Sequence, residues 1–170
     1  LFVAHTCPDV DTILITEGTY FPETKPYEMD VTMKGQEITT GNDRDLTFHI
    51  RQGLTIIGGF PGGGDDSPST AYKTNLVGRK EFSSFPSYHT IVMDTSTMWT
   101  NTNKESSIQY CIIKGGVSET GLDPDSIFVN GSWLNNSNGG GVYINGASGL
   151  LKYNTIKENL PAIAAAGYTT

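Results

Sequence analysis

The amino-acid sequence predicts an all-β fold, and in particular a right-handed, single-stranded parallel β-helix. Three observations support this prediction: many short strand-like runs separated by turn residues, alternation of apolar and polar side chains within the runs, and an internal repeat. Alternation is the pattern of a strand with one buried face, and a repeat distinguishes a solenoid from an ordinary sandwich of similar strands. The 20 glycines agree with a chain that turns often.

Composition limits what the chain can do. Its 170 residues suffice for a buried core, and we treat residues 1–170 as a single β-helix domain. The formal net charge of −7 would repel a polyanion over most of the surface, so nucleic-acid binding is disfavoured. No run reaches the roughly 18 apolar residues of a membrane span. Because the chain opens on Leu1 and ends on Thr170 without a visible cap, we expect an N-terminal fragment of a longer surface protein.

The expected strands are short, and each is bounded by Gly, Pro, Asn, Asp or Ser. The best helical candidate is residues 1–6, which would be the tail of a short N-terminal capping helix. Two long polar stretches, residues 21–44 and 118–140, are expected to project as inserted loops. The expected strands are residues 12–15, 46–50, 54–57, 75–77, 90–93, 108–113, 142–144 and 150–156.

The internal repeat lies in residues 110–116 and 153–159. Both segments follow the frame Tyr-x-x-Ile-Lys-x-Gly/Asn, 43 residues apart. We interpret this interval as two turns of about 20 residues each, with residues 142–144 as the strand of the intervening turn. Residues 54–59 are a weaker copy. The Gly-Gly or Glu-Asn pair after each strand is expected to form a corner at which the backbone adopts a positive φ.

The phase of the repeat assigns its side chains to two faces. Cys111 and Asn154 share an inward position, so we expect a small buried thiol and one step of an internal polar stack. Tyr110 and Tyr153 fall on the opposite phase and are expected to form an outward column along the coil. A disulfide between Cys111 and Cys7 stays open, because nothing in the sequence requires or excludes it.

Four segments share turn glycines and stacked apolar side chains: residues 11–22 (DTILITEGTYFP), 53–60 (GLTIIGGF), 111–116 (CIIKGG) and 139–143 (GGGVY). Together they resemble the pectin-lyase-like right-handed β-helix superfamily, and most closely its adhesin-type branch. The branch includes the chlamydial polymorphic outer-membrane proteins and large surface β-helix proteins of Bacteroidetes. The resemblance implies the fold and a secreted or cell-surface location, but no activity, because the shared residues belong to the scaffold.

Enzymes of this superfamily would need a site on aligned turns. A polysaccharide lyase uses acidic residues to hold Ca²⁺ and a Lys or Arg to accept the proton, and a glycoside hydrolase uses two carboxylates facing one cleft. The acids and bases of this chain do not fall in a repeat-aligned cluster, so we predict no catalytic residue. They are Asp65, Asp66, Asp94, Asp123, Asp125, Arg44, Arg51, Arg79 and Lys80.

No cofactor is expected, and the one metal considered is Ca²⁺. Asp123 and Asp125 are its weak candidates, although the segment that contains them is also typical of an ordinary turn. We interpret His5, His49 and His89 as bystanders, because none has a partner at catalytic or metal spacing.

The candidate ligand-binding residues are aromatic. Trp99 and Trp133 lie in polar loop sequence, either as buried anchors or as exposed contacts, and the column of Tyr110 and Tyr153 is either a docking strip or a packing surface. We predict a non-enzymatic protein, secreted or on a bacterial outer membrane, whose loops mediate adhesion to glycans or to host or matrix proteins. The alternative is a secreted polysaccharide lyase or glycoside hydrolase whose catalytic turns lie mostly outside these residues.

Overall fold

The structure, a computed structural model, describes residues 9–26, 43–62, 67–94, 104–119, 126–129, 132–160 and 163–166. Strands dominate these residues and most of them pair in parallel, as predicted. Helix is limited, in the same residues, to 3₁₀ conformation at Pro26 and at Asp43–Asp45. The expected capping helix at residues 1–6, Cys7 and most of the expected loop at residues 21–44 lie outside the described residues.

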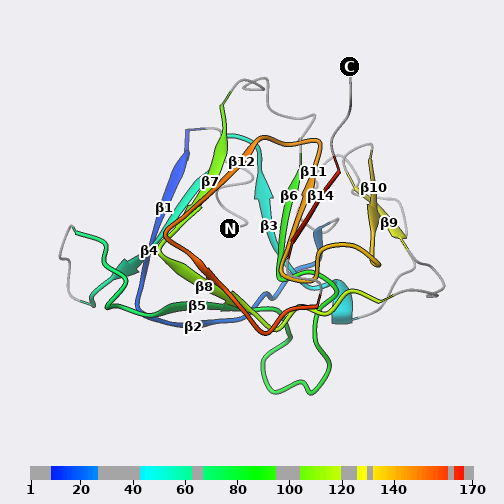
Figure 1. Ribbon diagram of the computed structural model, residues 1–170, viewed down its shortest axis with the longest axis horizontal. Coiled ribbons are helices and arrows are strands. Elements are labelled where there is room, and N and C mark those ends of the chain that lie inside the picture. The colour runs from blue at the N-terminus through cyan, green and yellow to red at the C-terminus, as the bar shows by residue number, and fades with distance from the viewer. Residues whose placement is uncertain are drawn as a thin grey trace.

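Twelve strands form three four-stranded parallel sheets on three sides of a common interior (Figure 1). The chain visits the sheets in the same order four times and adds one strand to each sheet at every pass. The first sheet contains β1 (Thr12–Thr16), β4 (Thr55–Phe60), β7 (Ser106–Gln109) and β12 (Gly149–Lys152). The second contains β2 (Gly18–Tyr20), β5 (Thr74–Val77), β8 (Cys111–Lys114) and β13 (Thr155–Ile156). The third contains β3 (Phe48–Arg51), β6 (Ile91–Asp94), β11 (Val142–Asn145) and β14 (Ile163–Ala166).

Two of the expected strands are each divided in two. The run at residues 108–113 breaks at Tyr110 into β7 and β8, and the run at residues 150–156 breaks at Tyr153 into β12 and β13. The chain turns there from the first sheet to the second, with φ of 56° at Tyr110 and 58° at Tyr153. These corners could not be predicted from the sequence, because tyrosine is not a residue that favours turns.

The expected loop at residues 118–140 contains secondary structure of its own. β9 (Ser126–Val129) and β10 (Ser132–Asn135) form an antiparallel hairpin, which Figure 1 shows beside the third sheet. Both strands are short and begin with serine, so they do not stand out from the polar sequence around them. The short strands β2 and β14 were also not predicted.

The interpretation of the 43-residue interval as two turns is wrong. β8 pairs directly with β13, and Ile112 lies opposite Thr155. β11 does not lie between them, because it belongs to the third sheet. The interval is long because the connection after β8 carries the β9–β10 hairpin, whereas the pass from Val142 to its partner Ile163 is about half as long. The weaker copy at residues 54–59 overlaps β4 of the first sheet and is therefore not equivalent to the other two.

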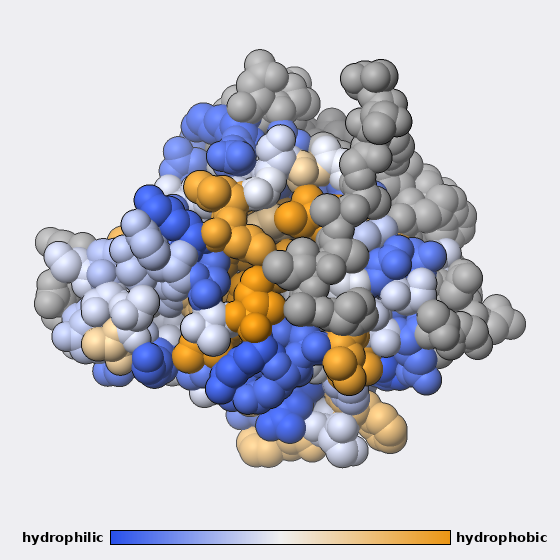
Figure 2. Space-filling model, viewed as in Figure 1, coloured by the Kyte–Doolittle hydropathy of each residue, from blue (hydrophilic) through white to orange (hydrophobic). Residues whose placement is uncertain are grey.

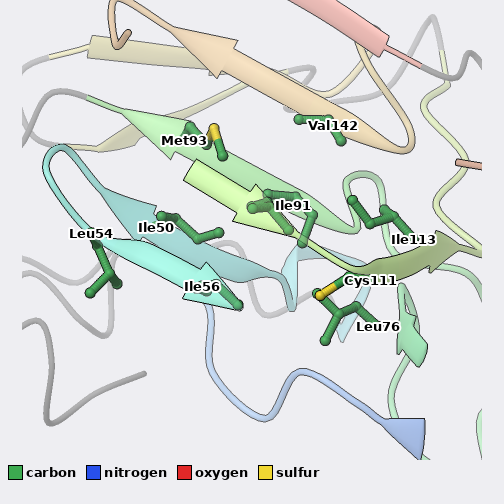
Figure 3. Packing of buried hydrophobic residues seen from close by; sticks show 10 residues of the cluster. Ile50, Leu54, Ile56, Leu76, Ile91, Met93, Cys111, Ile113 and Val142 are labelled. Carbon is green, nitrogen blue, oxygen red and sulfur yellow. The ribbon is translucent and has the colours of Figure 1, made fainter. Parts of the chain in front are cut away.

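Apolar side chains from all three sheets fill the interior (Figure 3). Burial of each leucine or isoleucine among them stabilises the fold by about 1.5–3 kcal/mol. Figure 2 shows apolar residues at the centre of one face of the molecule, where the interior meets its surface. Cys111 is buried as predicted, and burial raises the pKa of its thiol to about 12. The buried cluster comprises Ile50, Leu54, Ile56, Leu76, Ile91, Met93, Ile108, Cys111, Ile113 and Val142.

Two asparagine side chains bond to backbone groups of the preceding pass. Asn154 Oδ1 accepts a hydrogen bond from Cys111 N at 2.9 Å, and Asn154 Nδ2 donates to Ile108 O at 2.7 Å. Asn159 Oδ1 accepts from Gly116 N at 2.9 Å, and its Nδ2 donates to two backbone carbonyls. Asn154, which is half-buried, thus makes polar contacts with the backbone of the preceding pass, and Asn159 makes a second set. Each side chain satisfies buried backbone groups that would otherwise cost free energy.

The corners after the second sheet adopt the expected backbone conformation and are tightly packed. Gly115 and Glu158 have φ of 86° and 56°. A Cβ atom on Gly116 would lie 1.7 Å from Gly140 O, and one on Gly140 would lie 2.4 Å from Leu160 O. Gly116 and Gly140 lie at the two ends of the same β8–β11 connection, and Gly140 touches Leu160 of the next pass, so backbone atoms meet here and leave no room for a side chain.

Replacing Gly116 tests this close contact. We expect Gly116→Ala to lower the free energy of unfolding by about 2–3 kcal/mol, because backbone must move to admit the methyl group. Gly62→Ala is the matched control, since nothing lies within 4 Å of a Cβ at that position. Urea unfolding followed by circular dichroism measures both. Equal midpoints for the two variants would contradict the close contact.

Candidate functional site

The outer face of the third sheet is covered by a second layer of residues. His49, Val92 and Tyr143 alternate with side chains of the interior along β3, β6 and β11, yet they are buried. Figure 1 shows the β9–β10 hairpin on this side of the sheet. Leu134 of the hairpin is fully buried as well. The inserted connections therefore pack against this face and close it.

A buried hydrogen bond between a histidine and an aspartate lies within this layer. His49 Nε2 lies 2.6 Å from Asp94 Oδ1, and the two residues are 0% and 1% exposed. His49 therefore has a partner that its spacing along the sequence did not reveal. Its direct neighbour on β6 is Val92, and Asp94 is two positions further, a relation that appears only when the strands pair. Because both side chains are enclosed, the pair joins two strands and does not reach a substrate.

His89 is also buried, next to β11. Its ring stacks on Tyr143 with centroids 5.1 Å apart, and its Nδ1 lies 3.2 Å from Gly139 O. Burial lowers the pKa of His89 to about 4, so the ring is neutral near pH 7. His89 is thus part of the packing between the third sheet and the connection that follows β10.

The acidic residues considered for Ca²⁺ are not among the described residues. Asp123 and Asp125 lie outside them, as do Asp65 and Asp66. Within the described part of the chain, no three His, Cys, Asp or Glu side chains come together as a metal site would require. The same residues contain no helix long and apolar enough to cross a membrane.

Two of the four predicted aromatic residues are brought together. Tyr110 and Tyr153 lie one above the other, with ring centroids 4.9 Å apart, which confirms the expected column. Tyr153 is 58% exposed. Trp99 lies outside the described residues, and Trp133 belongs to β10 but its side chain is also outside them.

Tyr110, Tyr153 and the adjacent Lys152 form a surface that we call the tyrosine strip. Lys152 Nζ lies 4.9 Å from the centroid of the Tyr153 ring, and a small hollow separates the strip from Tyr72. In the preceding pass, Gly59 occupies the position equivalent to Tyr110. A Cβ atom on Gly59 would lie 3.0 Å from Tyr110 Cβ. Positive φ costs a residue with a side chain about 1–2 kcal/mol relative to glycine. Both tyrosines therefore occupy a backbone conformation that favours glycine.

Arg44 joins three connections that run from the second sheet to the third. Its Nε donates to Pro86 O at 2.9 Å and its Nη2 donates to Val117 O at 3.0 Å, while Nη1 pairs with Glu119. The guanidinium also lies over the ring of Tyr88, 4.1 Å from its centroid. From the sequence, Arg44 was a candidate only for a catalytic base; this structural role could not be predicted, because its partners lie 42 residues or more further along the chain.

A larger hollow lies beside Arg44. Its cavity volume is about 450 Å³, and its lining includes Phe21, Asp43, Lys80 and Phe82. Lys80 Nζ pairs with Asp43 Oδ2 at 3.0 Å, so Lys80, expected as a solvated corner, has a partner from another connection. Phe82 is 96% exposed. The sequence did not predict a pocket at these residues.

Comparisons with known proteins give no match to a family model, a curated protein or a solved structure. The likeness to a superfamily therefore rests on the sequence motifs.

The buried His89 predicts a pH dependence of stability. The unfolded chain binds a proton at this residue below about pH 6.5, whereas the folded chain does so only near pH 4. The free energy of unfolding therefore falls as the pH is lowered through this window. Between pH 7 and pH 5 the wild type should lose about 2 kcal/mol more than His89→Gln. Urea titrations at the two pH values measure the difference, and equal losses would argue against a neutral buried ring.

Arg44 predicts a stability effect that a retained positive charge does not rescue. Lysine cannot bond two carbonyls and a carboxylate in the planar arrangement of a guanidinium. We expect Arg44→Lys to lower the free energy of unfolding by about 1.5–3 kcal/mol. Arg79→Lys is the control, because Arg79 is exposed and lies 5.7 Å from the centroid of Phe21. If the urea midpoints of both variants equal that of the wild type, Arg44 does not hold the connections together.

Proposed function

We propose that the chain is a right-handed, single-stranded parallel β-helix of the pectin-lyase-like superfamily and belongs to its adhesin-type branch. The topology supports this proposal, because each pass adds one strand to each of three parallel sheets around an apolar interior. Each pass is then one turn of a solenoid, and insertions account for the unequal lengths of the turns.

The protein serves in recognition and not in catalysis, and it is secreted or displayed at a bacterial cell surface. It holds the tyrosine strip and the inserted connections toward glycans or toward host or matrix proteins. The observation that carries this proposal is the strip itself: two adjacent tyrosine rings, tilted by 35° to each other and held in a backbone conformation that favours glycine. Aromatic rings stacked along a sheet offer flat apolar faces to sugar rings or to a protein, and Lys152 adds a hydrogen-bond donor.

Glycine substitutions at the strip test this function with little risk to the fold. Glycine accepts the positive φ of Tyr110 and Tyr153, so removing the rings relieves backbone strain and offsets part of the lost stacking. We expect the double variant Tyr110→Gly/Tyr153→Gly to unfold within about 1 kcal/mol of wild type and to lose binding to a panel of glycans and matrix proteins by about tenfold or more.

Glu158→Gly is the matched control. It relieves the same backbone strain at another exposed corner, with φ of 56°, but removes no ring. The control should bind as the wild type does. Uronic-acid polymers are incubated in parallel with Ca²⁺. Unchanged binding by the double variant contradicts the role of the strip, and unsaturated products from the wild type would establish the enzymatic alternative instead.

A further inference from the structure

The hollow beside Arg44 lies between parts of two successive connections. One wall is the chain after β2, which includes Phe21, together with the 3₁₀ turn Asp43–Asp45. The other wall is the start of the β5–β6 connection, which includes Phe82. We call this feature the Phe82 hollow. Its volume of about 450 Å³ falls within the range of pockets that bind small ligands.

The loop that forms one wall is fixed at its base and along its length. Arg79 and Pro86 pair across the base in an antiparallel bridge, and Pro86 O accepts the hydrogen bond from Arg44. Within the loop, Ser83 N donates to Lys80 O at 3.0 Å and Ser83 Oγ accepts from Phe85 N at 3.1 Å. Figure 1 shows the loop projecting from the lower edge of the molecule. This wall of the hollow is therefore formed before a ligand arrives, which reduces the entropy lost on binding.

Phe82 is exposed in a backbone conformation that disfavours it. Its φ is 60°, where a residue with a side chain costs about 1–2 kcal/mol relative to glycine, and 96% of the residue is accessible to solvent. The ring thus gains almost no stability from burial in this chain. Strained positions of this kind concentrate at sites that bind a ligand. The ring of Phe82 is therefore available to a ligand in the hollow.

Charged groups of both signs line the hollow. Glu23, Asp43 and Glu81 contribute carboxylates, and Lys25 and Lys80 contribute ammonium groups. An anionic ligand would meet three carboxylates, and a cationic ligand would meet two ammonium groups, so neither is favoured. A hydroxyl group both donates and accepts hydrogen bonds, and it can therefore bond to groups of either sign. The lining favours an uncharged ligand that is rich in hydroxyl groups.

We propose that the Phe82 hollow binds an uncharged saccharide of about one or two sugar rings. The apolar face of a sugar ring lies against Phe82, and its hydroxyl groups bond to the carboxylate and ammonium groups of the lining. This inference rests on the proposed recognition function and extends it, because it adds a second site and names the class of ligand. The site lies on the connections between the second and third sheets, away from the tyrosine strip at the corner between the first and second.

Titration calorimetry with four disaccharides tests the ligand class. Cellobiose and maltose are the uncharged probes, digalacturonic acid is the anionic probe and chitobiose with free amino groups is the cationic probe. We expect an uncharged probe to bind more tightly than either charged probe. Tighter binding of digalacturonic acid or of the amino disaccharide would overturn the proposed class, as would the absence of measurable binding of both uncharged probes at millimolar concentrations.

Phe82→Gly tests the place of binding. Glycine accepts the φ of 60°, so the variant should be at least as stable as the wild type. Loss of the ring should weaken binding of the uncharged probe by about tenfold. Phe85→Ala is the matched control, because Phe85 is 68% exposed on the same loop but does not line the hollow. It should bind as the wild type does.

The outcomes separate this inference from the proposed function. If binding of the uncharged probe survives Phe82→Gly and is lost with Tyr110→Gly/Tyr153→Gly, the hollow is overturned and recognition through the strip stands. If Phe82→Gly abolishes binding while the strip variant binds normally, the hollow stands and the role of the strip fails. Equal loss with Phe85→Ala would overturn the assignment to the hollow.

Discussion

Backbone contact at the corner between the second and third sheets determines where the inserted segments leave the fold. Gly116 and Gly140 meet there with no space for a Cβ, and Asn159 bonds to Gly116 N from the next pass. Gly116 and Gly140 are the two ends of the β8–β11 connection, so this insertion leaves and returns at the same corner, where Gly140 also meets Leu160 of the next pass. Val117 N donating to Ser87 O and Tyr88 N donating to Arg44 O are the contacts of such neighbouring paths. The connections are therefore stacked in the same order as the strands.

The stacked connections cover the outer face of the third sheet but leave the corner between the first and second sheets exposed to solvent. Connections that leave from one corner fold over the third sheet, and they bury polar residues that an isolated sheet would expose, such as His49 and His89. Burial of these groups is tolerated because Asp94, Gly139 and the ring of Tyr143 provide partners. The corner between the first and second sheets carries no long insertion in the later passes, so the tyrosine strip stays exposed.

The sequence predicted those features that depend on neighbours along the chain. Alternation located β3 and β4, and the Glu-Asn pair of the repeat predicted the positive φ of Glu158. The sequence did not reveal features that depend on pairing between passes. Tyr110 looked like the interior of a strand because a positive φ at tyrosine is imposed by the tertiary structure. The His49–Asp94 pair and the Phe82 hollow depend on which connections become neighbours, and the insertions that decide this have no recurring length.

Residues in the left-handed region offer an independent indication of function. Four residues other than glycine have positive φ in the described part of the chain, and three of them are the aromatic residues Phe82, Tyr110 and Tyr153. At about 1–2 kcal/mol each, their strain is a substantial fraction of a typical folding free energy of about 5–15 kcal/mol. Glu158 shows that a corner of this kind does not require an aromatic ring. Phe82 and Tyr153 are largely exposed, so burial does not offset the strain of their backbone conformation, and strained positions of this kind concentrate at functional sites.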